Sequence, residues 1–328
     1  MTGRLRASST SSLLGLVFSC ALLSPAQSKP PRSAPVSLLP ILQPALAVAT
    51  GNSEAGIPDL VRQKRWKEVA ELAQKESLKN PGDPSHFYWL GIARFQLQDP
   101  VGAVQALRSA EKLGLNTALF HEGLGLAYQK LNQYFLFERQ MEKASALDPR
   151  DPRPLYYLGL YHVTIKSDVA TGLSYFDRAL RLRSDDAKSL YQRGNCLEKM
   201  GRWKEARGAY TDAISLVEKS GEHLGWPFQG MARLLLEESP QEALGFAKKA
   251  VELEPNEYSN HLTLAKVYER LGNLPEAVRE AQVATTQDPT SSTARYALFK
   301  LYRRSGDLEA SETELKMFEK LRAVYGPE

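Results

Sequence analysis

Cysteine is scarce in this chain of 328 residues, which contains only Cys20 and Cys196. The sequence therefore lacks the paired cysteines of small disulfide-stabilised secreted domains. If residues 1–28 are removed, as argued below, Cys196 remains alone and cannot form an intramolecular disulfide. It follows Gly194 by two residues in a helical apolar pattern, so we expect a buried and unreactive thiol.

A strong net charge is missing as well. The 42 Lys and Arg residues nearly balance the 38 Asp and Glu residues, for a formal net charge of +4. Removal of residues 1–28 takes away Arg4 and Arg6 and lowers this charge to +2. A nearly neutral chain of this size does not favour nucleic-acid binding driven by counterion release.

Motifs for catalysis and metal binding are absent. The sequence has no G-x-S-x-G motif, no phosphate-binding glycine loop and no cysteine with a suitably placed histidine. The histidines lack the i, i+4 or CxxC companions of a metal site: His86, His121, His162, His223 and His261. We therefore expect no enzyme activity, metal or cofactor, and we expect His121 and His261 to pack between helices.

The amino terminus has the pattern of a secretory signal peptide. Arg4 and Arg6 precede an apolar run at residues 13–23, and residues 26–28 (AQS) fit a small-x-small cleavage site. We expect residues 1–28 to be removed and the mature chain to be exported, to a periplasm or out of the cell. Two alternatives stay open, namely a membrane anchor formed by an uncleaved signal and a lipid attached to Cys20.

Residues 29–54 form a proline-rich segment. Five prolines between residues 30 and 44 exclude a regular helix and predict an extended tether. The segment is also apolar at residues 36–41 and 45–49. These stretches either lie in a groove of the rest of the protein or, at residues 45–49, contain a later cleavage site, and the residues leave both possibilities open.

From residue 55 onward the chain repeats with a period of about 34 residues. One ladder of small residues is Gly91, Gly125, Gly159, Gly194, Gly230 and Ala265. A second ladder in phase with it is Ala110, Ala144, Ala179, Ala213, Ala250 and Ala284. Such a period indicates stacked units that bury their apolar faces against their neighbours. One continuous array over residues 55–328 leaves no room for a separate catalytic domain.

One unit, residues 87–115, reads FYWLGIARFQLQDPVGAVQALRSAEKLGL, in which Gln98, Asp99 and Pro100 separate two stretches of helical apolar spacing. A helical hairpin with Leu-Gly, then Tyr, then Ala and a closing Pro about 34 residues on resembles the tetratricopeptide repeat. The resemblance covers roughly residues 55–322. It implies an all-α fold, a right-handed superhelical α-solenoid of about eight hairpins.

Some residues depart from the repeat pattern. Phe137 stands where a small residue is usual in the second helix, and Gly125 is expected to make room for it. Extra residues at 166–168 and 220–225 predict loosened connections where the array bends. Phe299 and Phe318 replace small residues in the last unit, where we expect them to cap the open end.

By resemblance, the first helix of each hairpin lines the concave face through repeat positions 2, 5, 9, 12 and 13, with Gly91 and its equivalents at position 8. A partner segment would bind in this groove. The candidate residues are Tyr88, Ile92, Phe95, Glu122, Leu126, Gln129, Tyr156, Leu160, Tyr191, Asn195, Lys266, Arg270, Tyr296, Lys300, Arg303 and Arg304.

Two subsets of these residues suggest a ligand. The tyrosines at position 5 offer rigid apolar surface with a hydroxyl group, although tyrosine is ordinary there. The C-terminal cations suit an acidic peptide, a carboxylate or a phosphate-bearing polymer, unless glutamates such as Glu269 neutralise them. The Lys, Arg and Asn set with which some family members hold a terminal carboxylate is missing from any three consecutive units.

These patterns predict a non-catalytic scaffold, exported in a bacterial envelope, that binds a protein or peptide partner in the concave groove. The alternative is a structural component of an envelope-assembly or polymer-export machine within a membrane-associated complex. Glu122, Glu198 and Lys199 are the nearest candidates for acid–base chemistry, and their spacing does not bring them together.

Overall fold

The computed structural model describes residues 56–325, and all regular structure in this part of the chain is α-helical. The predicted signal peptide, the proline-rich tether and Cys20 lie outside the described residues. Consecutive helices pair into eight helical hairpins. The helices are α2 (Ile57–Arg62), α3 (Trp66–Lys79), α4 (Pro84–Gln96), α5 (Pro100–Lys112), α6 (Ala118–Lys130), α7 (Tyr134–Leu147), α8 (Arg153–Thr164), α9 (Val169–Leu182), α10 (Ala187–Lys199), α11 (Trp203–Ser220), α12 (Trp226–Leu235), α13 (Pro240–Leu253), α14 (Tyr258–Arg270), α15 (Leu274–Gln287), α16 (Ser292–Ser305) and α17 (Leu308–Tyr325).

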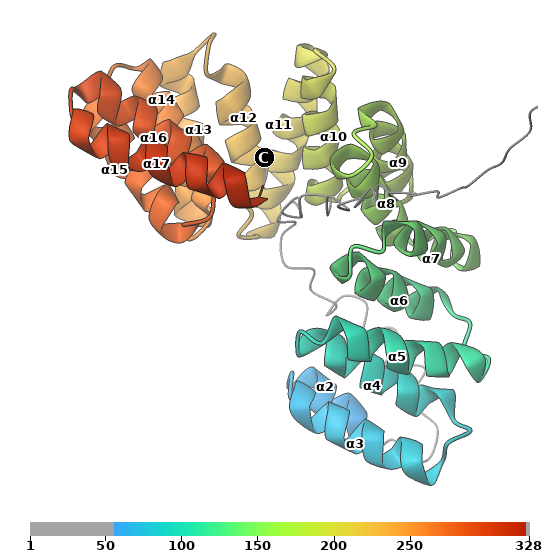
Figure 1. Cartoon of the computed structure of the whole chain (residues 1–328). Coiled ribbons are helices and arrows are strands. Elements are labelled where there is room, and N and C mark those ends of the chain that lie inside the picture. Colours follow the sequence, from blue (N-terminus) through green and yellow to red (C-terminus); the bar gives the residue numbers. More distant parts are fainter. Residues whose placement is uncertain (1–55, 326–328) are drawn as a thin grey trace, which may run out of the picture.

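Each first helix packs against its own second helix and against the second helix of the preceding hairpin. The first helices also contact one another, as α10 contacts α12 and α12 contacts α14, so they form the inner row of the array. Figure 1 shows the hairpins following a curved path from α2 and α3 at one end to α16 and α17 at the other. The all-α solenoid of about eight hairpins predicted from the sequence is confirmed.

The turn inside most hairpins contains one residue with a left-handed backbone. Its φ is 57° at Asn132 and 73° at Gly201, and the feature recurs in every described hairpin except α12–α13. Asn and Gly tolerate this conformation well. The full series is Lys64, Gln98, Asn132, Ser167, Gly201, Gly272 and Gly306. After this residue the next helix begins, often with a side-chain cap such as Asp99, whose carboxylate accepts from the Gly102 amide at 2.8 Å.

The two ladders of small residues lie where paired helices come closest. A Cβ at Gly91 would be 2.6 Å from Leu107 Cγ, and one at Gly159 would be 2.7 Å from Phe176 Cε1. The alanines of the second ladder are all buried: Ala110, Ala144, Ala179, Ala213, Ala250 and Ala284. The regular spacing of the small residues therefore results from helix packing, as predicted from the repeat period.

Gly125 allows a close approach of α7, the helix that carries Phe137, but it faces the Phe137 backbone and not the Phe137 ring. A Cβ at Gly125 would be 2.9 Å from Met141 Cε and 3.5 Å from the Phe137 carbonyl oxygen. The Phe137 ring is fully buried and packs edge-on against Tyr161 of the next hairpin, with 5.5 Å between ring centroids. The large side chain is thus placed between hairpins instead of within its own.

The apolar core changes from one cluster to another within the fourth hairpin. Leu158 and Tyr161 of α8 belong to the N-terminal cluster, whereas Leu173 and Phe176 of α9 belong to the next one. The extra residues 166–168 connect these two helices, and Ser167 there has φ of 54°. The fourth hairpin therefore joins the two main parts of the core.

Candidate binding site on the concave face

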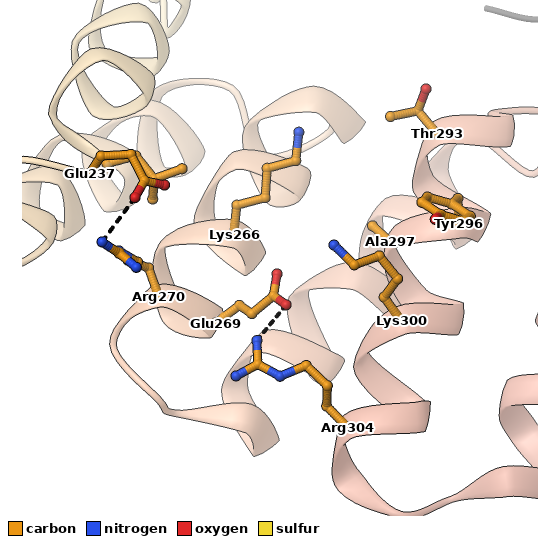
Figure 2. Close-up of a pocket in the computed structure, with 10 residues that line it drawn as sticks. Glu237, Lys266, Glu269, Arg270, Thr293, Tyr296, Ala297, Lys300 and Arg304 are labelled. Atoms are coloured by element: carbon orange, nitrogen blue, oxygen red, sulfur yellow. Dashed lines mark hydrogen bonds and ion pairs between the residues drawn. The ribbon is translucent and has the colours of Figure 1, made fainter.

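A hollow of about 490 Å³ lies at the C-terminal end of the inner row. Side chains from α14 and α16 form most of its wall, and the end of α12 closes one side (Figure 2). The lining residues are Leu236, Glu237, Lys266, Glu269, Arg270, Thr293, Tyr296, Ala297, Lys300 and Arg304. We call this hollow the C-terminal pocket.

Two arginines of the C-terminal pocket are held by carboxylates. Arg270 Nη2 lies 2.9 Å from Glu237 Oε2, and Arg304 Nη1 lies 2.6 Å from Glu269 Oε1. Each pair joins neighbouring hairpins, because Glu237 follows α12 and Arg304 ends α16. The arginines are therefore oriented, and their charge is largely balanced.

The two lysines are different. Neither Lys266 nor Lys300 has an ion pair with any residue in the described part of the chain, and Figure 2 shows Lys300 pointing from α16 toward α14. Desolvation in the hollow, together with the charges of Arg233 and Lys300, lowers the pKa of Lys266. Glu269 of the same hollow acts in the opposite direction on Lys266, but its carboxylate already pairs with Arg304. The hollow therefore keeps a positive charge that a negatively charged ligand would balance.

An aromatic ring forms the far wall of the pocket. Tyr296 is 45% exposed, and its ring centroid lies 5.0 Å from that of Phe318 and 5.6 Å from that of Phe299. The two phenylalanines that depart from the repeat pattern therefore support the tyrosine from behind. A supported aromatic ring offers contact area to a ligand at low entropic cost.

Half of the residues that line the C-terminal pocket are candidates from the repeat positions. Of the six C-terminal candidates, five line it, and Arg303 is exposed outside the lining. Glu269 pairs with Arg304, as its proximity in sequence suggested. Leu236, Glu237, Thr293 and Ala297 were missed. Glu237 lies beyond the end of α12, where the repeat pattern assigns no groove position, so only the three-dimensional arrangement shows its pairing with Arg270.

The N-terminal candidates have a different environment. Tyr88, Ile92, Phe95, Glu122 and Leu126 are all at most 7% exposed. Gln129 of α6 is half-buried. These side chains face neighbouring groups and do not form an open polar surface, so they are separate from the C-terminal pocket.

The candidates in the middle of the array are half-buried and packed against aromatic neighbours. Tyr156 lies 5.8 Å from Phe176 and Tyr191 lies 6.1 Å from Trp226, both between ring centroids. Leu160 packs against the second core cluster. Among the four tyrosines at position 5, only Tyr296 is classed as exposed. The predicted tyrosine row therefore does not form one continuous exposed surface.

Asn195 takes part in a polar network between two hairpins. Its Oδ1 accepts from Arg233 Nη2 at 2.7 Å and from the Tyr210 hydroxyl at 2.8 Å. Arg233 also binds Glu198 through two hydrogen bonds of 2.8 and 2.7 Å. Burial acts to raise the pKa of Glu198, but the hydrogen bonds and charge of Arg233 lower it overall. The network holds α10 and α12 together.

Glu122 is a buried carboxyl group in the N-terminal half. It is 1% exposed, its Oε2 lies 3.4 Å from Arg153 Nη2, and its Oε1 has no hydrogen-bond partner. Burial raises the pKa of Glu122 to about 8, although Arg153 acts in the opposite direction. At neutral pH this carboxyl group is therefore largely protonated. It is far along the array from Glu198, in line with the expectation that the two do not form a pair.

The remaining polar expectations concern histidine and cysteine. His121 is buried between Gln140 (2.5 Å) and Asn116 (2.7 Å), and His261 is buried between Glu280 (2.7 Å) and the Pro255 carbonyl (2.9 Å). Both therefore pack between helices, as predicted.

Cys196 is buried, and desolvation raises the pKa of its thiol to about 12, so the thiol is unreactive. Residues 56–325 contain no cluster of metal-ligating side chains.

Comparison with known proteins agrees with the repeat. Residues 185–255 match the tetratricopeptide repeat family. The DnaJ homolog subfamily C member 7 homolog of Schizosaccharomyces pombe is 25% identical over 232 residues, which cover 60% of this chain and 48% of that protein. The chain thus spans about half the length of this relative.

Several crystal structures have a similar fold. The APC/C hetero-tetramer Cut9–Hcn1 gives a TM-score of 0.65 at 13% identity, over 78% of this chain and 50% of that chain. Yeast Tom70 gives 0.57 at 18% identity, over 79% and 55% respectively. A tetratricopeptide repeat protein from Parabacteroides merdae ATCC 43184 gives 0.60 at 14% identity, over 75% and 95%. The chain therefore shares the α-solenoid fold of these structures, and its residues 185–255 match the tetratricopeptide repeat family.

The comparisons thus give the fold of most of the chain and a family match for residues 185–255. In the described part of the molecule, no helix is both long enough and apolar enough to cross a bilayer.

Proposed function

We propose that this protein is an interaction scaffold that binds an acidic segment of a partner protein in the C-terminal pocket. The observation that carries the proposal is that the ammonium groups of Lys266 and Lys300, which form no ion pair with a described residue, lie in the same pocket as the ring of Tyr296, which packs against Phe318. Four cationic side chains and two carboxylates line the pocket, so it presents two net positive charges to a ligand.

The chemistry of the pocket favours carboxylates on an extended segment. Lys266 and Lys300 are exposed and stand at equivalent positions of consecutive hairpins. Packed helices lie about 10 Å apart, so two acidic side chains separated by a few residues of extended chain can each reach one ammonium group. The ring of Tyr296 would contact an apolar residue of the same segment.

The rigid array also favours binding. Packing through α13 and α15 holds α12, α14 and α16 in place before a partner arrives, and the exposed arginine–glutamate pairs add a modest link. A preformed site loses little conformational entropy on binding, which leaves more of the interaction energy for affinity. The partner, in contrast, need only supply an accessible acidic stretch.

The ligand class is tested with two labelled decapeptides that differ only in charge. One carries four glutamates around a central leucine, and the other carries glutamines at the same four places. Fluorescence anisotropy with the purified chain should show binding of the glutamate peptide, weakening as salt rises from 50 to 300 mM because salt screens exposed charges. Equal binding of both peptides, or binding insensitive to salt, would contradict an acidic ligand.

A further inference from the structure

The concave side of the N-terminal half is apolar, in contrast to the C-terminal pocket. Residues at the groove positions of α4 and α6, with one from α8, supply this surface. We call them the apolar concave face: Tyr88, Ile92, Phe95, Leu119, Leu126 and Tyr157. A row of large apolar side chains along a groove is a recurrent feature of docking surfaces.

The groove positions are much less exposed in the N-terminal half than at the C-terminal end. At repeat position 9, Ile92 is 0% and Leu126 is 1% exposed, whereas Lys266 and Lys300 at the same position in the last two hairpins are exposed. The helices that mainly pack on α4 are α3, α5 and α6, which lie behind it and beside it along the array. Ile92 also contacts α6, where a Cβ at Gly123 would be 3.1 Å from its Cδ1, so neighbouring helices account for part of this burial.

The chain itself contains a segment that suits this surface. Residues 33–53 form an uncharged stretch of 21 residues between Arg32 and Glu54, and they include VSLLPILQPALAVA at residues 36–49. Prolines keep such a stretch extended, with free backbone donors and acceptors. An apolar strand without charge fits a face whose carboxyl group, Glu122, is largely protonated at neutral pH.

The segment is also within reach. It ends three residues before Gly56, which precedes α2, and α2 contributes Ile57 and Val61 to the same core cluster as Tyr88 and Ile92. An extended stretch of this length reaches roughly 60 Å or more, and the face from α4 to α8 spans roughly 20 Å for helices packed about 10 Å apart. The length therefore permits docking within one molecule.

Polar atoms beside the face have unmet hydrogen-bonding capacity. The Tyr88 hydroxyl, Glu122 Oε1 and Arg153 Nη1 are buried without a hydrogen-bond partner. Buried groups of this kind are costly unless paired. The carbonyl groups of an extended backbone can accept hydrogen bonds from the Tyr88 hydroxyl and the Arg153 guanidinium. A protonated Glu122 carboxyl can donate to such a carbonyl or accept from a backbone N–H.

We propose that residues 33–53 dock along the apolar concave face of their own chain, so that the N-terminal half of the groove is occupied from within and only the C-terminal half is open to a partner. This surface is distinct from the C-terminal pocket, and the proposal does not depend on the function proposed above. It selects the first of the two possibilities that the sequence left open for this segment.

A photocrosslinking experiment on the full chain tests this directly. A benzoylphenylalanine is placed at Leu119, a half-buried position at the margin of the face, and at Thr293 as the matched control, because both residues stand at position 2 of their repeats. After irradiation of dilute protein, crosslinks from residue 119 should map to residues 33–53 within monomers. The same segment should be rare among crosslinks from residue 293.

Charge substitutions in the segment provide the second measurement. The double variant L39D/I41D should reduce crosslinking from residue 119 by about tenfold or more, because it places charges against an apolar face. The control S33D/S53D adds the same charge at the ends of the stretch and should retain most of the crosslinks. Circular dichroism confirms that both remain helical.

Other outcomes overturn the proposal. Crosslinks found only in dimers would mean that a second copy covers the face. Crosslinks from residue 119 that avoid residues 33–53, or that survive L39D/I41D unchanged, would mean that the segment does not dock there.

Discussion

Gly194 of α10 lies directly against the ring of Tyr210 of α11, so that a Cβ at residue 194 would be only 2.4 Å from Tyr210 Cε1. The ring cannot easily move, because it is fully buried and a Cβ at Gly230 of the next hairpin would also be 2.7 Å from it. Its hydroxyl is further held by Asn195 and Glu198. A single tyrosine thus explains why two successive units need glycine.

Gly194→Ala should therefore destabilise the protein, by about 1 to 3 kcal/mol, because the added methyl group overpacks a fixed contact. Gly208→Ala is the matched control in the adjacent helix, since a Cβ there meets no atom within 4 Å. It should raise stability by about 0.5 to 1 kcal/mol through helix propensity. Urea denaturation followed by circular dichroism measures both, and equal effects would contradict the packing role of the glycine ladder.

The contact between Arg233 and Glu198 should stabilise the junction of the fifth and sixth hairpins. The arginine side chain is 38% exposed and the glutamate 17% exposed, so solvent screens part of the interaction. Arg233→Ala should cost about 1 to 2 kcal/mol, since it also removes a partner of Asn195. Arg202→Ala, which breaks the exposed pair with Glu205, should cost less than about 0.5 kcal/mol. Thermal unfolding of the two variants separates these cases.

The stability of the N-terminal half should depend on pH through Glu122. Its pKa is about 8 in the folded chain and near 4.5 when unfolded, so the folded state holds its proton more tightly. This group therefore contributes stability that is fully present below about pH 4.5 and is lost as pH rises through about 8.

Glu122→Gln should remove this dependence. The variant is expected to resemble the parent near pH 4.5 and to be more stable at pH 9, by on the order of 1 to 3 kcal/mol. Glu205→Gln, an exposed change on α11, serves as the control and should follow the parent at both values. Parallel melting curves for E122Q and the parent between pH 4.5 and 9 would contradict a buried, protonated Glu122.

The sequence predicted the architecture well because the repeat period is a direct consequence of helix packing. Gly194, Gly230 and the buried alanines appear at fixed spacing since the same contact recurs in each hairpin. The five C-terminal candidates that meet in the pocket were found for the same reason, because their repeat positions place them on one face.

The sequence could not distinguish open from covered parts of that face. Repeat position 9 is occupied by Ile92 and by Lys266 alike, yet only Lys266 is exposed. Exposure depends on what lies opposite in space, which the local pattern does not contain. The pairing of Glu237 with Arg270 was missed for a similar reason, since it joins the end of one hairpin to the groove position of the next.

The most direct test of the proposed function is to remove the positive charges of Lys266 and Lys300. The variant K266A/K300A is compared with K188A/K199A, which removes two exposed lysines from α10 elsewhere on the inner row. Binding of the four-glutamate decapeptide should weaken by about tenfold or more in K266A/K300A, because each lost charge-assisted contact is worth about 1 kcal/mol or more, and by less than about threefold in the control. If both variants bind the peptide as the parent does, or if both lose affinity equally, the C-terminal pocket is not the binding site.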